Sequence, residues 1–425
     1  MLDQQEVPLV QALEEYNKKE PVRFHVPGHK GRERNTGFFS NIYPYDVTEI
    51  PGLDDLHDAQ EAILKAQQLA AEAFGADETF FLIGGSTVGN IAMVMAACHP
   101  GDQILVQRNV HKSVIHGLIL ARAKPIYLNP EIDRTTGHAL TVSVNHLKKM
   151  LNLNPQVKAV FLSNPNYYGM GMRLRPYAEL CNEYHIPLLV DEAHGAHMGF
   201  GSIPSGGMQE GATAVVQSTH KMLTSMTMSS MLHLKGDLLD SGRIRQLLAM
   251  LQSSSPSYPL MASLDLARRE MATKGNERIA SSLTLARQLV QGIKNLNIQW
   301  LQVVEQGNYD YLDPLKITLR TTACEFNGHK LKQFLEGYHI YPELADDRHV
   351  LLLLSVNTTK RDVQRTVEVI SYLPKLHSVV GNTEHPIAHL FSQEVVLTPH
   401  EAFYRETKMV PWREAIGQIC GELIA

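Results

Sequence analysis

Residues 187–197 read PLLVDEAHGAH, an apolar run that ends at Asp191. A short and continuously apolar run is typical of a strand that is buried on both faces of a parallel sheet. An acid at the end of such a strand is costly unless a charged or hydrogen-bonding partner satisfies it. The pattern therefore predicts that Asp191 faces a cationic ligand group or caps a helix. A metal site built from Asp191, His194 and His197 is a further interpretation.

Similar apolar runs, rich in β-branched or aromatic residues, alternate with helix-period segments between residues 79 and 234. This alternation predicts an α/β fold with a mostly parallel sheet covered by helices on both faces. Ligands of such sheets bind beyond the carboxyl ends of the strands. The predicted strands are Thr79–Ile83, Ile104–Val106, Lys158–Leu162, Pro187–Val190, Ala214–Gln217 and Ser229–Leu234.

The rest of the chain predicts three parts: an N-terminal segment (residues 1–45), a large domain (46–300) and a smaller C-terminal α/β domain (301–425). The large domain includes a helix that ends at Gly75, a plausible C-cap, and a long connecting helix near its end. The predicted elements are helices Glu61–Phe74, Leu260 to about Leu296, Gly328–Tyr338 and Asp362–Leu373, strands Lys316–Arg320 and Val350–Val356, and a final helix-like stretch from Pro411.

Two more features fall at predicted strand ends. Gly84-Gly85-Ser86-Thr87 precedes the apolar helix Val88–Ala97, and such a turn can gather N–H groups and hydroxyls around a phosphate, although it is more often structural. Lys221 follows the strand that ends at Gln217. A lysine there is usually solvated, but among apolar walls its pKa can fall enough for imine formation. A phosphate cradle, then an acid, then a lysine 30 residues later is the order of fold-type I pyridoxal-phosphate enzymes.

Composition excludes several other classes of protein. The 425 residues are 44% hydrophobic and 20% charged with a net charge of -5, which predicts a globular protein that binds small molecules and not nucleic acid. Its longest strongly apolar run, Val350–Leu354, is far shorter than the roughly 20 residues of a membrane helix. Without a secretory pattern at the N-terminus or disulfide spacing, a cytoplasmic protein is predicted. The cysteines are predicted to be packing residues: Cys98, Cys181, Cys324 and Cys420.

Six motifs cover residues 24–268 almost continuously. They are FHVPGHKG at 24–31, TEIPGLDDLH at 48–57, QRNVHKS at 107–113, VDEAHGAH at 190–197, STHK at 218–221 and SSSPSY at 253–258. With them the chain resembles the Orn/Lys/Arg decarboxylase family, in its short form without an N-terminal wing domain. The resemblance implies a fold-type I large domain, bound pyridoxal 5'-phosphate, and a homodimer or larger homo-oligomer. No metal is expected, because no further cluster of ligand residues accompanies Asp191, His194 and His197.

The resemblance also assigns roles. Lys221 would be the Schiff-base lysine, and Asp191 the partner of the pyridine nitrogen. His111 would stack on the cofactor ring; otherwise it is a helix-terminal histidine in the His-Lys-Ser turn. His194 would lie near the cofactor hydroxyl or the substrate carboxylate. The phosphate would be held by the turn at Gly85 and by Ser86, Thr87, Ser218 and His220.

The sequence departs from the family pattern at two places. Met228 occupies the position where members commonly have Gln, which puts a local polar contact in doubt. The chain ends at Ala425, where members usually continue, so either the small domain is shortened in this member or the sequence is truncated.

The implied function is decarboxylation of a basic amino acid, with arginine to agmatine in polyamine synthesis preferred over lysine to cadaverine or ornithine to putrescine. An aminotransferase or lyase on the same scaffold is the alternative, with Arg320 available for a substrate carboxylate, and an inactive cofactor-binding protein is another. The stretch Ser253–Tyr258 is a candidate for reaching a neighbouring subunit, or it is simply a loop. A cationic substrate side chain needs an acidic residue to bind it. The candidate acids are Glu49, Asp54, Asp55 and Glu343, each of which can also be a solvated loop acid or a helix cap.

Overall fold

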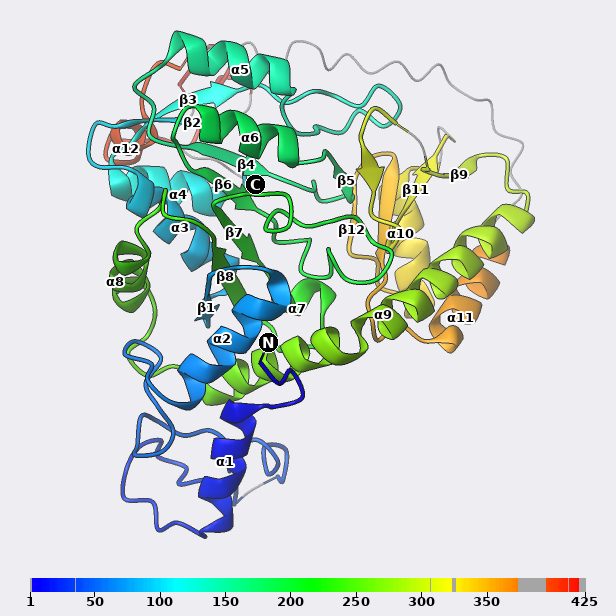
Figure 1. Cartoon of the computed structure of the whole chain (residues 1–425). Helices are drawn as coiled ribbons and strands as arrows, with labels where there is room; N and C mark the ends of the chain where they lie inside the picture. The colour runs from blue at the N-terminus through cyan, green and yellow to red at the C-terminus, as the bar shows by residue number, and fades with distance from the viewer. Residues whose placement is uncertain are drawn as a thin grey trace.

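A seven-stranded sheet forms the centre of the computed structural model, in the order β1-β8-β7-β6-β4-β2-β3 (Figure 1). β8 pairs antiparallel with β1 and β7, and the pairs from β7 to β3 are parallel. The predicted α/β fold class with a mostly parallel sheet is therefore confirmed. The strands are β1 (Glu78–Leu82), β2 (Gln103–Gln107), β3 (Lys124–Leu128), β4 (Val160–Ser163), β6 (Leu188–Asp191), β7 (Ala214–Gln217) and β8 (Ser230–Leu234). The structure describes residues 2–34, 36–305, 307–322, 326–373, 395–411 and 413–419.

One strand of this sheet was not predicted. β3 lies at the sheet edge and is only partly buried, so its sequence KPIYL lacks the continuous apolar run that marks the inner strands. Pro125 is compatible with an edge position, where a missing N–H breaks no ladder.

Helices cover both faces of the sheet. Along β2, Ile104 and Val106 pack into one apolar cluster while Leu105 packs into another, because successive side chains of a strand point to opposite faces. The first face is covered by α3 (Gly85–Ala97), α4 (Lys112–Ala121) and α8 (Ser241–Leu251). The other is covered by α2 (Ala62–Phe74), α5 (Val144–Leu153), α6 (Arg175–Glu183) and the start of α9.

The long predicted helix is α9 (Tyr258–Asn295), and it runs from the central sheet to a second sheet (Figure 1). The second sheet is antiparallel in the order β12-β13-β11-β9. The predicted elements of this region are confirmed, while the division of the chain at residues 45 and 300 stays a prediction. The elements are β9 (Leu301–Val303), β11 (Lys316–Thr321), α10 (Gly328–Gly337), β12 (Leu344–Ala345), β13 (His349–Leu353) and α11 (Lys360–Ser371). A short pair, β5 (Met170–Gly171) with β10 (Tyr311–Leu312), joins the two regions.

The helix predicted from Pro411 is wrong. Residues 413–419 form turns and are exposed, so they have no buried face that would stabilise a short helix. A five-residue helix, α12 (Pro399–Phe403), precedes them and packs near α4. Cys98 and Cys181 are buried and free as predicted, whereas Cys324 and Cys420 lie outside the described residues. Among the helices of the described part of the chain, no candidate for a membrane span was found.

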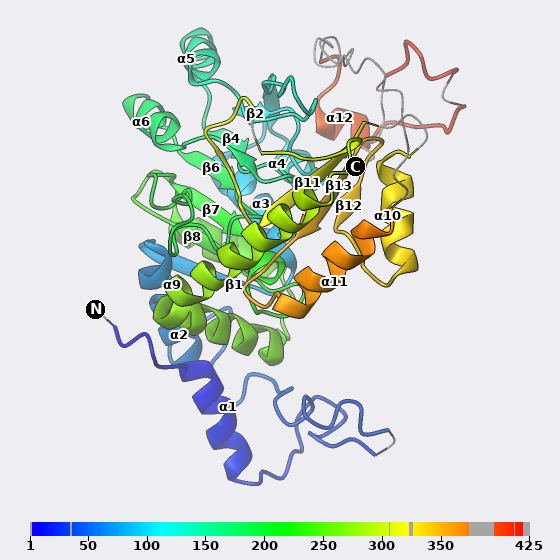
Figure 2. The same ribbon diagram turned by 90° about the vertical axis from the view of Figure 1, so that its right-hand side faces the viewer.

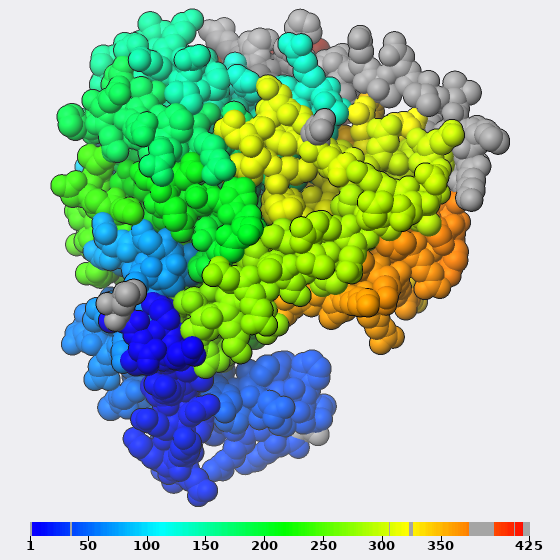
Figure 3. All heavy atoms as spheres, turned by 45° about the vertical axis from the view of Figure 1, so that its right-hand side comes forward, coloured from blue at the N-terminus to red at the C-terminus, as the bar shows by residue number. Residues whose placement is uncertain are grey.

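The N-terminal segment is anchored by α1 (Pro8–Lys18), whose Leu9 and Leu13 are buried against α2 and α9. Arg268 on α9 is fully buried, pairs with Asp265 and donates hydrogen bonds to the carbonyl oxygens of Gln4 and Glu6. The residues after α1 contain no helix or strand up to α2 in their described part, and they project from the body of the molecule (Figures 2 and 3).

Candidate active site

A cavity of about 290 Å³ lies where β2, β4 and β6 end, beside the short helix α7 (Thr219–Met222) that follows β7. Parallel strands bring their carboxyl ends to one edge of the sheet, which is why residues distant in sequence meet here. The cavity brings together five of the predicted site residues, namely Ser86, His111, Asp191, His194 and Lys221. The predicted residues Gly85, Thr87, Ser218 and His220 are not part of its lining.

Asp191 is the last residue of β6 and is 7% exposed. Its Oδ2 accepts a hydrogen bond from Asn90 Nδ2 at 2.8 Å, and its Oδ1 accepts one from the N–H of Ala193 at 3.0 Å. These two neutral donors fix the orientation of the carboxylate on the cavity wall. A cationic group inside the cavity would therefore meet a carboxylate that is already oriented to bind it.

Lys221 and His194 form a contact between an amine and an imidazole. Lys221 Nζ lies 3.0 Å from His194 Nε2. Burial lowers the pKa of Lys221, opposed by the charges of Asp191 and Glu343. Burial also lowers the pKa of His194 well below its usual value, helped by nearby lysine charges. A neutral His194 can therefore accept a hydrogen bond from the Lys221 amine, leaving that amine oriented in the cavity.

His111 is the helix-terminal residue that one sequence interpretation described, and its stacking on a cofactor ring stays a prediction. It is the N-cap of α4, where its Nδ1 accepts a hydrogen bond from the N–H of Ser113 at 3.2 Å, and it also lines the cavity. Burial lowers the pKa of the imidazole, which favours the neutral form.

The predicted phosphate cradle lies at the N-terminus of α3. Gly85 has φ +72°, a conformation that favours glycine, and its N–H donates to the carbonyl oxygen of Met228 at 2.7 Å. Ser218 Oγ donates to Ser86 Oγ at 2.9 Å. Because Met228 contributes a backbone oxygen and its side chain is exposed, this contact does not require a particular side chain at position 228.

The remaining predicted phosphate ligands stand next to this turn. Thr87 follows Ser86 on the first turn of α3 and is partly buried. His220 lies on α7, where its Nδ1 is 2.8 Å from the carbonyl oxygen of Ser229. That contact leaves the Nε2 atom of His220 available to another group.

The metal interpretation of the DEAHGAH stretch is wrong for the described structure. His197 Nε2 lies 3.0 Å from Asp313 Oδ2, and both side chains are fully buried, while His194 contacts Lys221. Among the described residues, the group that could hold a metal ion is a different one, made of His138, Asp346 and His349. There the Asp346 carboxylate already contacts both imidazoles and accepts a hydrogen bond from Tyr168 Oη at 2.6 Å.

Comparison with known proteins decides the family. Residues 7–362 match the family described as Orn/Lys/Arg decarboxylase, major domain. The chain belongs to this family. It is similar to an arginine decarboxylase of Bacillus subtilis (35% identity, covering 100% of this chain and 89% of that protein) and to one of Bacillus anthracis (36%, covering 100% and 88%). Among solved structures it is similar to lysine decarboxylase A of Pseudomonas aeruginosa, with a TM-score of 0.77 and 25% identity.

The solved lysine decarboxylase is a longer chain. The similarity covers 86% of this Orn/Lys/Arg decarboxylase family member but 59% of the Pseudomonas chain. The match over residues 7–362 confirms the family that the sequence motifs indicated.

Several residues in or next to this family member's cavity were not predicted from the sequence. Tyr167 lies on its wall, with its ring centroid 4.3 Å from that of His194. Lys316, at the start of β11, is 1% exposed; its Nζ donates to the carbonyl oxygen of Tyr167 at 2.8 Å, and burial lowers its pKa to about 7. No local signal marks Lys316, because a lysine at the beginning of a strand usually reaches solvent. Ser163 and Asn166 also line the cavity and could have been found, since they follow a predicted strand as Asp191 does.

Other predicted residues lie elsewhere. Arg320 is not part of the cavity lining, so it gives no support to an aminotransferase. The Asp54 carboxylate accepts hydrogen bonds from backbone N–H groups at the start of α2, and Asp55 accepts from the N–H of His57 within a turn, so both carboxylates bind backbone. Tyr258 is fully buried and donates to the carbonyl oxygen of Asp54. The serines at 253–255 are exposed, so a contact of the stretch Ser253–Tyr258 with a neighbouring subunit stays a prediction.

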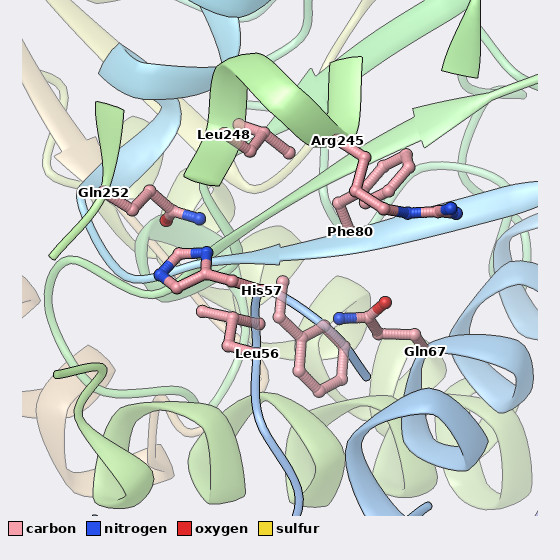
Figure 4. Close-up of a pocket in the computed structure, with 8 residues that line it drawn as sticks. Leu56, His57, Gln67, Phe80, Arg245, Leu248 and Gln252 are labelled. Carbon is pink, nitrogen blue, oxygen red and sulfur yellow. The ribbon is translucent and has the colours of Figure 1, made fainter. Parts of the chain in front are cut away.

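A second hollow lies between the central sheet, α8 and the segment before α2 (Figure 4). His57, Gln252 and Leu248 are among the side chains around it. Its volume of about 10 Å³ is enough for about one water molecule and too small for a substrate.

Proposed function

We propose that this chain is a pyridoxal-phosphate-dependent decarboxylase of a basic amino acid, with arginine as the preferred substrate and agmatine as the product, in polyamine metabolism. The observation that carries the proposal is the convergence of Lys221, Asp191 and His111 on one cavity. It is supported by similarity over the full chain to proteins named arginine decarboxylase.

The residues around the cavity fit the cofactor. The N-terminus of α3 with Ser86 offers N–H and hydroxyl groups for a phosphate, Asp191 offers a carboxylate for a pyridine nitrogen, and Lys221 offers an amine for an aldehyde. Two buried polar atoms on the wall, Ser163 Oγ and His194 Nδ1, have no hydrogen-bond partner within the described residues, as expected where a polar ligand binds.

When bound, the cofactor supplies an electron sink for the pair that remains on the α-carbon as CO2 leaves. Asp191 holds a proton on the pyridine nitrogen, which raises the capacity of that sink. His111 covers the ring and limits its movement. Ser86 and the start of α3 fix the phosphate end, so that the breaking bond keeps one orientation relative to the ring.

Lys221 would hold the cofactor through its amine. Its lowered pKa increases the share of the neutral, nucleophilic amine, and His194 orients that amine by accepting one of its protons in a hydrogen bond. Tyr167 closes the side of the cavity next to both groups.

Glu343 is our candidate for the cationic end of the substrate. Tyr167 Oη donates to Glu343 Oε1 at 2.7 Å, and the Glu343 charge acts on Lys221, so this acid lies near the cavity. Of the other acids proposed from the sequence, Asp54 and Asp55 already accept hydrogen bonds from backbone N–H groups. A carboxylate can bind a guanidinium through two parallel hydrogen bonds, and it can also pair with an ammonium group, so the preference for arginine rests on the similarity to arginine decarboxylases.

The substrate prediction is tested with purified protein and added cofactor. We expect kcat/KM for arginine to exceed that for lysine and ornithine by about tenfold or more, because the unpaired groups of a site built for a guanidinium penalise an ammonium. CO2 and amine product are measured for each substrate, and Asp191→Asn protein serves as the blank. Preference for lysine would replace agmatine by cadaverine, and failure with all three would overturn the proposed function.

We also propose that the chain is a cytoplasmic homodimer or larger homo-oligomer. The projecting N-terminal segment carries apolar side chains that a monomer leaves in water: Phe24 is 94% exposed and Phe38 is 79% exposed. Burial against a second copy of the chain would remove this unfavourable contact. Figure 3 shows the segment as a lobe separated from the main body at this face.

The oligomer prediction concerns the mass of the protein in solution. Light scattering should give a mass of at least two chains, and Phe24→Ser with Phe38→Ser should shift the equilibrium toward monomer because both changes remove apolar contact area. Phe403→Ser, at an exposed phenylalanine of α12, is the matched control and should leave the mass unchanged. A wild-type mass of one chain would refute the oligomer.

A further inference from the structure

A chain of side-chain hydrogen bonds connects two of the candidate catalytic groups through residues that have no assigned role. Asn90 on α3 is fully buried, and its Nδ2 donates to Asp191 Oδ2 at 2.8 Å and to Ser113 Oγ at 2.9 Å. Ser113 Oγ in turn lies 2.8 Å from His111 Nδ1. The connection therefore runs from the end of β6 through α3 to the first turn of α4.

The direction of each hydrogen bond is fixed by two groups whose roles cannot change, the Asp191 carboxylate and the backbone N–H of Ser113. The Asp191 carboxylate accepts, so the Asn90 amide must present its N–H₂ group, and both hydrogens are used. Ser113 Oγ accepts one of them and keeps a second lone pair, so this bond alone does not place its own hydrogen. The backbone N–H of Ser113 can only donate, and it donates to His111 Nδ1 at 3.2 Å, so this ring nitrogen carries no proton and the Ser113 hydroxyl donates to it as well. His111 Nδ1 is thus an acceptor of two hydrogen bonds, and the proton of the neutral ring is on Nε2.

We propose that Asn90 and Ser113 are positioning residues that hold His111 in its neutral, Nε2-protonated form and tie its orientation to Asp191. A proton on Nδ1 would oppose the fixed N–H of Ser113 and would force the Ser113 hydroxyl to turn away. This relay of hydrogen bonds, which runs from Asp191 through Asn90 and Ser113 to His111, therefore disfavours protonation of His111. The catalytic benefit of the relay rests on the proposed function. A neutral imidazole can cover a protonated pyridine ring without placing two positive charges together.

Charged groups around His111 act in both directions. Asp191 favours its protonation, whereas Lys221, Lys112 and His116 disfavour it, and burial favours the neutral form. The relay and burial both favour the neutral ring of His111, whereas the charge of Asp191 favours the protonated ring. Removing the relay should therefore make His111 easier to protonate.

The first test reads the proton on His111 directly and needs no turnover. The full chain is prepared with ¹⁵N-labelled histidine, and His111 is assigned among the 20 histidines by comparison with His111→Gln. We expect the Nε2–H tautomer and a titration midpoint below about 6.5, the usual histidine value. In Asn90→Leu and in Ser113→Ala the midpoint should rise, by about one pKa unit for Asn90→Leu, and Nδ1–H should become detectable.

Two controls separate positioning from general damage to the fold. Ser113→Thr keeps the hydroxyl and should retain the wild-type tautomer. Ser143→Ala removes a different helix cap, at the start of α5, and should leave the His111 signals unchanged. If Asn90→Leu does not fold, Ser113→Ala still tests the relay.

The second test uses the enzyme with cofactor. Asn90→Leu and Ser113→Ala should lower kcat roughly 10- to 100-fold with little change in KM, while Ser113→Thr restores it. Signals of His111 that are identical in wild type, Asn90→Leu and Ser113→Ala would overturn the relay, as would an Nδ1–H tautomer in the wild type. If the tautomer is as expected and no basic amino acid is decarboxylated, the relay stands and the proposed function fails.

Discussion

Replacement of Lys221 by alanine should reduce decarboxylation by about 10⁴-fold or more, a loss of roughly 5.5 kcal/mol of transition-state stabilisation. The reason is that the amine at the end of α7 is the group that binds the cofactor covalently. The fold should survive, because alanine removes a partly buried amine whose charged form burial disfavours. Activity is measured as CO2 release and folding by thermal denaturation. Lys235→Ala, at an exposed lysine, is the matched control and should keep full activity.

The same assignment can be checked chemically. Borohydride reduction of the enzyme with pyridoxal phosphate, followed by peptide mapping, should place the pyridoxyl group on Lys221. Lys316 is the nearest competitor, since both amines lie within 6 Å of the Tyr167 ring centroid, at 5.7 Å for Lys221 and 5.6 Å for Lys316. Lys316 is fully buried and bonded to a backbone carbonyl oxygen, so it should remain unlabelled. A label on Lys316 would contradict the assignment.

Asp191→Asn should lower kcat by about 10²- to 10³-fold while leaving cofactor bound through the phosphate end of the cavity. The amide cannot hold a proton on the pyridine nitrogen by charge, and this charge matters most in the transition state. Some stability is also lost. The new N–H₂ group must face either Asn90 Nδ2 or the N–H of Ala193, and a meeting of two donors costs about 1 to 3 kcal/mol.

The Asp191 result is read from single-turnover rates and from cofactor absorbance. Asp240→Asn is the matched control, because Asp240 also accepts a backbone N–H, at the start of α8, but lies outside the cavity. Asp240→Asn should therefore keep its rate, and it should also keep most of its stability because asparagine caps a helix about as well as aspartate. Near-normal turnover in folded Asp191→Asn protein would show that the acid does not govern the chemistry.

The site residues that lie next to strand ends could be predicted from local sequence. Asp191, Lys221 and Ser86 each follow or precede a continuous apolar run, and a buried parallel strand produces such a run whatever its neighbours are. The rule that ligands bind at the carboxyl ends then places these residues at one edge of the sheet. The family motifs added His111 and His194, which have no strand-end signal as strong as that of Asp191.

Only the structure showed which polar residues form hydrogen bonds that connect the candidate catalytic groups. Asn90 lies inside the apolar helix α3 and Ser113 in the first turn of α4, and neither carries a sequence pattern that distinguishes a bridging side chain from a structural one. Their contact with Asp191 and His111 exists because α3 and α4 pack on the same face of the sheet. A hydrogen bond between residues 101 positions apart is a property of this packing, and no local spacing encodes it.

Lys316 shows that the protonation of a buried charged group cannot be predicted from local sequence either. From sequence it is a lysine at the start of a strand in the second region of the chain. In the structure β11 brings it under Tyr167, where burial lowers its pKa to about 7 and places a second amine behind the cavity. The sequence by itself determined the fold class, the family and the groups that carry the proposed chemistry, because apolar periodicity and local motifs are properties of neighbouring residues. The tertiary structure alone decided the partners, the burial and hence the protonation of those groups, because these depend on contacts between segments that are far apart in the chain.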